Sequence, residues 1–110
     1  MEIIILQSVT LKIRRFCEFQ ERSHQEVKEK LYGLGLYKMQ VEVVLAQLIE
    51  DNYLNEERFA TAFARGKFRI KNWGRIKIKY ELQQRRVSSY NINKALDDID
   101  ETVYIETLQK

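Results

Sequence analysis

The side chains of this 110-residue chain whose type and spacing could do chemistry are basic, and they gather between Arg65 and Arg86. This stretch holds nine Lys and Arg residues against one acid, Glu81, a local balance of +8 in a chain of formal net charge +3. The remaining residues therefore sum to −5. A block of one sign this dense points to a polyanion or an acidic protein surface as partner. The alternative is a solvated helix face, but the interleaved aromatic residues favour a binding surface.

The candidate partner-binding residues lie in this stretch or just before it. They are Arg58, Arg65, Lys67, Arg69, Lys71, Trp73, Arg75, Lys77 and Lys79. Two of them have a second interpretation: Arg58 as one half of an intramolecular ion pair, and Trp73 as a hydrophobic wedge between two structural units. Gly74 is then expected to allow the turn between those units.

Other chemistry is not supported by the residues present. One Cys and one His cannot build a zinc site, no Ser-His-Asp set can be assembled, and the four glycines fit neither phosphate-binding loop. Acidic groups could hold Mg²⁺ for a nuclease, but they are expected at helix ends, where the helix dipole explains them. These groups are Glu50/Asp51, Glu56/Glu57 and Asp97/Asp98/Asp100. We expect no enzyme, no cofactor and no small-molecule substrate.

Composition sets the class of protein. The chain is 45% hydrophobic and 32% charged, which is typical of a folded domain. It has no proline, which suits nearly continuous helices. The single Cys17 cannot form an internal disulfide and is expected as a buried hydrophobe. No apolar run approaches the ~20 residues of a membrane span, and Met1 to Leu6 lack the features of a signal peptide. A cytoplasmic protein without membrane contact is expected.

Periodicity and capping residues predict the elements that position the basic stretch. Residues 1–9 could form a short strand, an extended arm or an expression artefact, and a helix is expected from Thr10. Ser23 and Glu26 form a capping box, and Gly35 is expected to end that helix in a left-handed conformation. The next helix covers about 39–52, with the apolar stripe Val41, Val44, Leu45, Leu48 and Ile49.

Four further helices are expected downstream. Asn55 is expected to cap a helix whose Phe59, Ala62 and Phe63 face inward. A helix over 75–86 follows Trp73 and Gly74, with Ile78 and Leu82 on one side. A capping residue predicts the start of each of the last two helices, one at Ser88 or Ser89 and one at Asp100.

An internal repeat relates the two halves of the chain. A shift of 51 residues superposes seven apolar positions: Val27/Ile78, Leu31/Leu82, Leu36/Val87, Val41/Ile92, Val44/Ala95, Leu45/Leu96 and Leu48/Ile99. The predicted organisation is an arm and leading helix (1–22), a first three-helix repeat (23–72) and a truncated second repeat (73–110). In that division the basic stretch spans the junction of the repeats. The fold class is all-α with tandem three-helix repeats, elongated and curved.

Three motifs resemble the RecX family of bacterial RecA regulators. They are CEFQERSHQEVKEKLYGLGL, LIEDNYLNEERFATAFARGKFR and WGRIKIKYELQQRRVS, in the family's order and register. The resemblance implies an all-α protein of three-helix repeats that binds in the groove of the RecA filament. It also implies modulation of ATPase and strand exchange in recombination, DNA repair and the SOS response. Family members usually carry three repeats, so the third has no counterpart here, and residues 1–9 match nothing in the family.

The partner implied by the resemblance is RecA or the RecA–DNA filament, with direct DNA contact from the same basic residues. A competing hypothesis is a helix-turn-helix module that binds nucleic acid by itself, since three short basic helices suit that class. The scattering of basic residues around the helices argues against it. A third hypothesis is a structural scaffold whose charge confers only solubility.

Overall fold

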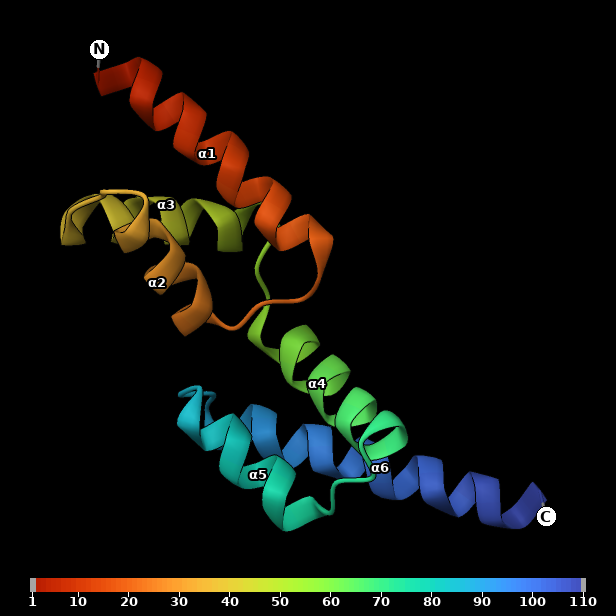
Figure 1. Cartoon of the computed structure of the whole chain (residues 1–110). Helices are drawn as coiled ribbons and strands as arrows, with labels where there is room; N and C mark the ends of the chain where they lie inside the picture. The colour runs from red at the N-terminus through yellow and green to blue at the C-terminus, as the bar shows by residue number, and fades with distance from the viewer. Residues whose placement is uncertain (1, 110) are drawn as a thin grey trace. The chain divides into compact units, whose positions relative to one another are not determined.

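In this computed structural model the backbone is described for residues 2–109 and side chains for residues 7–99. The described backbone forms helices joined by short turns and loops, without a strand (Figure 1). The helices are α1 (Glu2–Phe19), α2 (His24–Gly33), α3 (Lys38–Glu50), α4 (Glu56–Ile70), α5 (Arg75–Gln84) and α6 (Ser89–Gln109). The chain is therefore all-α, as predicted.

The chain divides into two compact units, Met1–Asn55 and Glu56–Lys110. Each unit contains three helices, α1 to α3 in the first and α4 to α6 in the second. The predicted boundary between residues 72 and 73 therefore falls inside the second unit. The reason is that α4 packs against α5 and α6, although the apolar pattern had grouped it with the two helices before it.

The first unit encloses a core to which all three of its helices contribute. The isoleucine-rich start of the chain belongs to α1, so residues 2–9 form neither a strand nor an extended arm. Helix propensities differ by less than about 1 kcal/mol between ordinary residues, so β-branched side chains do not prevent a helix. The buried residues are Val9, Ile13, Cys17, Val27, Leu31, Leu36, Val41, Leu48 and Leu54. Cys17 is buried, as expected.

Helix α2 begins and ends at the residues that the sequence predicts. The backbone N–H of Glu26 donates to Ser23 Oγ at 3.1 Å, and the backbone N–H of Ser23 donates to Glu26 Oε1 at 3.4 Å. At the other end Gly35 has φ +97°. The N–H of Leu36 then donates to the carbonyl of Leu31 at 3.3 Å, which completes a Schellman turn.

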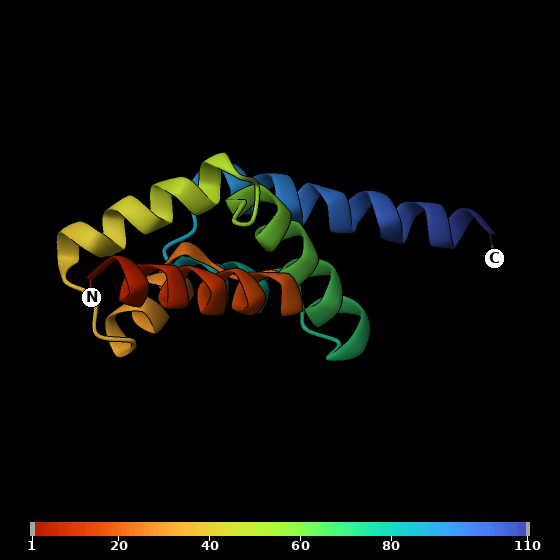
Figure 2. The ribbon, with the colours of Figure 1, turned by 90° about the horizontal axis from the view of Figure 1, so that it is seen from above.

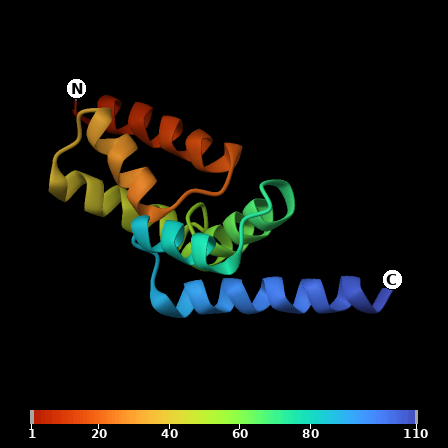
Figure 3. The ribbon, with the colours of Figure 1, turned by 60° about the horizontal axis from the view of Figure 1, so that its bottom comes forward.

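The second unit is organised around a close pair of helices, α4 and α6, whose interface is the most extensive in the chain. Ala60, Ala64 and Ala95 are fully buried there, and small side chains allow two helix backbones to approach closely. Ala62, predicted to face inward, is exposed because it lies on the opposite side of α4 from Ala60 and Ala64. Figure 3 shows α5 and α6 side by side in opposite directions, joined by a short turn.

The two units follow one plan. Adding 51 to the ends of α2 gives the ends of α5, and adding 51 to the first residue of α3 gives that of α6. The last residue of α1, Phe19, corresponds in the same way to Ile70, the last residue of α4. The 51-residue offset that relates α2 to α5 and α3 to α6 thus also relates α1 to α4. The repeated three-helix unit therefore begins with α1 and with α4.

Helix α6 departs from this plan at its C-terminal end. It continues without a break to Gln109 (Figure 2), so Asp100 does not begin a separate helix. In the first unit, α3 stops where Asn52 adopts a left-handed conformation with φ 64°. The corresponding position is Val103, and a β-branched residue does not adopt that conformation readily. The predicted apolar members Tyr104, Ile105 and Leu108 lie outside the described side chains.

One turn of the second unit carries a backbone conformation that glycine would adopt more easily. Arg86, the counterpart of Gly35, has φ 59°, and Val87 N–H donates to the Leu82 carbonyl at 3.1 Å in the same type of turn. A side chain in the left-handed region costs about 1 kcal/mol. We therefore expect Arg86→Gly to raise the free energy of unfolding by about that amount in urea titrations. The converse Gly35→Arg should lower it, and equal stabilities for all three proteins would contradict this account.

Candidate partner-binding surface

All nine predicted partner-binding residues lie in the second unit, on α4, on α5 or in the turn between them. Trp73 and Gly74 therefore lie within a unit rather than between two units. Gly74 is the N-cap of α5 with φ −78° and ψ 172°, a backbone conformation open to any residue. A Cβ at this position would meet no atom within 4 Å. The turn does not depend on glycine, contrary to the prediction.

Trp73 forms the centre of a group of aromatic and basic side chains. Its ring packs at 65° to that of Phe63, with the centroids 6.2 Å apart, and both rings lie against the core of the second unit. Lys67 Nζ and Lys77 Nζ lie 5.0 and 4.4 Å from the Trp73 ring centroid, and the Arg85 guanidinium lies 4.7 Å from that of Phe63. We call these five residues the aromatic–cation cluster. Such contacts contribute about 0.5–1 kcal/mol each at exposed sites.

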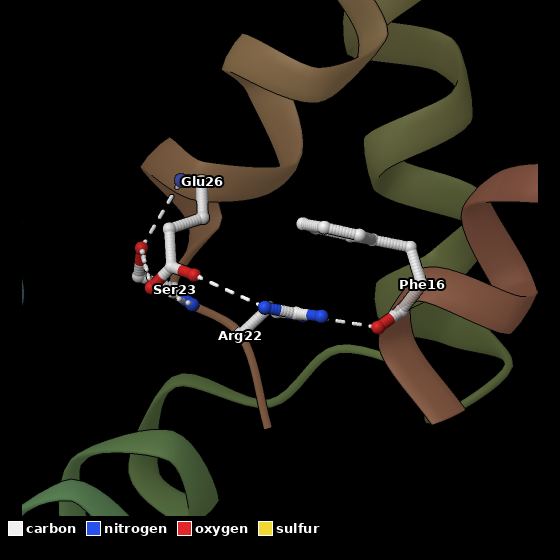
Figure 4. A network of polar contacts seen from close by, with 4 residues as sticks. All are labelled: Phe16, Arg22, Ser23 and Glu26. Atoms are coloured by element: carbon white, nitrogen blue, oxygen red, sulfur yellow. Dashed lines mark hydrogen bonds and ion pairs between the residues drawn. The ribbon is translucent and has the colours of Figure 1, made fainter. Parts of the chain in front are cut away.

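The first unit contains a corresponding pair with the residue types exchanged (Figure 4). The Arg22 guanidinium lies 3.8 Å from the Phe16 ring centroid and donates from Nε to the Phe16 carbonyl at 3.0 Å. Adding 51 to these positions gives Lys67 and Trp73, where the backbone N–H of Trp73 donates to the Lys67 carbonyl at 3.1 Å. The pair joins the end of one helix to the start of the next in both units. Lys67 and Trp73 therefore have a structural role.

Arg65 is held by an acid of α6. Its Nε and Nη2 donate to the two carboxylate oxygens of Asp98 at 2.6 and 2.8 Å. The hydrogen bonds and charge of Arg65 hold the pKa of Asp98 below its usual range, and Asp98 in turn raises the pKa of Arg65. Asp98 lies in the interior of α6 and not at a helix end, so its role is to fix α4 against α6.

The Asp98 pair gives stability a defined pH dependence. Because the folded-state pKa of Asp98 is lowered, its contribution is present above the unfolded pKa and is lost as the pH falls through the folded pKa. Asp98→Asn should lower the free energy of unfolding at pH 7 by up to about 1 kcal/mol, the range of a solvent-exposed pair. The difference from the parent protein should shrink as the pH falls below the usual aspartate pKa and should vanish only below the lowered folded-state pKa of Asp98. Asp97→Asn, next to it and exposed, is the control; equal losses in both variants would contradict the assignment.

Two further contacts join α4 to α6 beside this pair. Glu57 Oε1 pairs with Lys94 Nζ at 2.8 Å. Glu56 Oε1 accepts from the Ser88 N–H at 2.9 Å and from Asn91 Nδ2 at 2.8 Å. Three of the acidic residues considered for Mg²⁺, Glu56, Glu57 and Asp98, thus bind basic and amide groups of their own unit. Among the described residues, no three His, Cys, Asp or Glu side chains are grouped to hold a metal ion.

The remaining basic residues divide by exposure. Lys71, Arg75 and Lys79 are exposed at the end of α4 and along α5. Arg69 is exposed as well, but its charge acts on Asp98 and lowers the pKa of that carboxyl. Arg58 is half-buried on α4. Lys71, Arg75 and Lys79, with Lys77 beside them, thus form the exposed basic side of α5 and the turn before it.

Two further residues of the same surface were not among the nine predicted partner-binding residues, although Tyr80 was one of the aromatic residues noted in the basic stretch. Ile76 and Tyr80 lie one turn apart on α5 with 87% and 55% of their surface exposed, whereas Ile78 is fully buried. Residues two apart on a helix do not share a face. The pair Ile76 and Ile78 was therefore a signal that one of them points to solvent. Among the described residues, no helix is both long enough and apolar enough to cross a membrane.

Comparison with known proteins identifies the family. The sequence profile of the second three-helix domain of RecX matches residues 55–96. The chain is 36% identical over 81 residues to the regulatory protein RecX of Prosthecochloris aestuarii, covering 74% of this chain and 54% of that protein. It is 33% identical over 81 residues to that of Halorhodospira halophila, covering 74% and 50%. The chain thus spans about half the length of these relatives.

Solved structures show the same fold. A crystal structure of regulatory protein RecX superposes with a TM-score of 0.79 at 18% identity, over 86% of this chain and 47% of that one. The crystal structure of RecX from Lactobacillus salivarius gives 0.77 at 19% identity, over 86% and 61%. The profile match begins at residue 55, one residue before the second compact unit begins. The chain belongs to the RecX family of regulatory proteins.

Proposed function

We propose that this chain binds the RecA–DNA filament and modulates its ATPase and strand-exchange activity, and so acts in recombination and DNA repair inside the cell. The observation that carries the proposal is the exposed positive charge of Lys71, Arg75 and Lys79 on a RecX-family unit. Such a surface would attract the DNA phosphates of a filament and any acidic protein surface beside them. Neither a cofactor nor a catalytic group is part of the proposal.

The test is binding to RecA filaments and to naked DNA over a salt series. We expect tighter binding to filaments assembled on single-stranded DNA with ATP than to the same DNA alone. We also expect a dose-dependent change in filament ATP hydrolysis. Binding to naked DNA of equal strength, with log affinity falling by about 0.7 per phosphate contact on single strands or 0.9 on duplex, would instead support a DNA-binding module. No filament preference and no change in ATP hydrolysis would refute the proposal.

A further inference from the structure

The exposed side of α5 forms one wall of an open groove whose other wall belongs to α6. The α5 wall carries the basic side chains Arg75, Lys77 and Lys79 together with the apolar side chains Ile76 and Tyr80, and Leu96 contributes from α6. Among the described residues, no carboxylate lines the groove. The groove therefore combines positive charge with an apolar strip. This strip is neither part of the run of basic residues nor buried in the core of the unit.

The apolar strip is not required by the three-helix fold. The first unit has the same helix at the same position, and the residues that correspond to Ile76 and Tyr80 are Gln25 and Glu29. Gln25 Nε2 donates to Glu29 Oε1 at 3.3 Å in an exposed, polar pair. The fold therefore forms with polar residues at both positions. Ile76, with 87% of its surface exposed, contributes little burial to the second unit.

We propose that this groove binds an acidic segment of a partner protein, with an apolar side chain of that segment packed against Ile76 and Tyr80. The proposal rests on the function proposed above, in which the segment belongs to the protein part of the filament. Charge complementarity to Arg75, Lys77 and Lys79 selects the acidic segment. Bases can stack on Tyr80, but the exposed aliphatic Ile76 favours protein over nucleic acid, because a phosphate backbone offers no apolar group to cover it. Protein interfaces commonly combine aromatic and aliphatic groups in their core with polar and charged groups around them.

The first test uses the double variant Ile76→Ser/Tyr80→Ser on filaments. Both side chains are exposed, so the variant should fold like the parent. Loss of the apolar contact should weaken filament binding about tenfold or more and leave the salt dependence unchanged, since no charge is removed. Met39→Ser/Val43→Ser is the control, because those side chains are 80% and 70% exposed on α3 of the first unit. Parent-like binding by the Ile76/Tyr80 variant would overturn the inference while leaving filament binding intact.

The second test does not depend on RecA. Calorimetric titrations would use a helical peptide with glutamate on one face and leucine on the other. The comparisons are a peptide of equal charge in which serine replaces leucine, and an oligothymidine of equal charge. We expect the leucine peptide to bind tightest, and its advantage to disappear in the Ile76/Tyr80 variant. Equal binding of the two peptides, or tighter binding of the oligonucleotide, would overturn the inference. Failure of the parent protein to bind filaments, with the peptide preference intact, would refute only the proposed function.

Discussion

Replacing Ala64 by leucine should destabilise the second unit by about 2–3 kcal/mol, the largest effect on stability that we expect from one substitution. Ala64 is fully buried in the closely packed interface of α4 and α6. Added methylenes there must separate two helices that polar contacts hold together, from Glu56 with Asn91 at one end to Arg65 with Asp98 at the other. Urea unfolding followed by circular dichroism would measure the loss. Hydrogen exchange would show that it affects amides of residues 56–99.

Ala62→Leu is the matched control for this prediction. The residue is also an alanine of α4, two positions earlier, but it is exposed. A leucine there should change the free energy of unfolding by no more than about 0.5 kcal/mol. In the first unit, Ile13 fills the position that corresponds to Ala64 and is also fully buried. A loss in Ala64→Leu no greater than that in Ala62→Leu would show that α4 and α6 can separate freely.

Reversing the charge of Lys71, Arg75 and Lys79 to glutamate should weaken binding to RecA–DNA filaments by one to two orders of magnitude. Each replacement turns an attraction into a repulsion toward an anionic surface, and close charge pairs across an interface couple by about 1.5 kcal/mol or more. The three side chains are exposed, so folding should be preserved. Surface plasmon resonance on immobilised filaments would measure the change. Most of it should appear in the association rate and diminish at high salt.

The control reverses three exposed lysines of the first unit, Lys12, Lys28 and Lys38, and changes the net charge by the same amount. Lys28 is also the counterpart of Lys79 at the 51-residue offset. This variant should bind within about threefold of the parent, because long-range charge alone is largely screened at physiological salt. Equal weakening by the two triple variants would remove α5 from the binding surface and leave only a general effect of net charge.

Most of the helices of this protein were readable from its sequence, and their grouping was not. Ser23 with Glu26, Gly35 and the stripe from Val41 to Leu48 each indicate a helix or its end through local interactions that do not depend on the rest of the fold. Grouping depends on which helices approach each other. The correspondence of α1 with α4 joins Val9 to Ala60, Ile13 to Ala64 and Cys17 to Phe68, pairs that share a position on the helix but not a residue type. Each pair is apolar, like the seven pairs of the repeat, but its side chains differ more in size, so this match is weaker than that of the other two helices.

The binding surface was predicted as a stretch of charge, and the structure divides that stretch by contacts distant in sequence. Arg65 meets Asp98 across 33 residues, and that distance does not follow from the periodicity of either helix. Lys67 and Trp73 meet because the chain turns at Asn72, which has φ 58°. Which basic residues point outward thus depends on tertiary packing. The exposed Ile76 could have been recognised, since Ile78 two residues later occupies the buried face.

The place of Trp73 also makes the second unit separately observable. It is the only tryptophan in the chain, and it packs against the core of residues 56–99 while two lysine ammonium groups lie over its ring. Its fluorescence emission should therefore report unfolding of this unit alone, since the first unit has tyrosine and phenylalanine as its aromatic residues. Circular dichroism averages over all six helices. Two units that unfold independently would give two transitions in ellipticity, and the emission of Trp73 would follow only one of them.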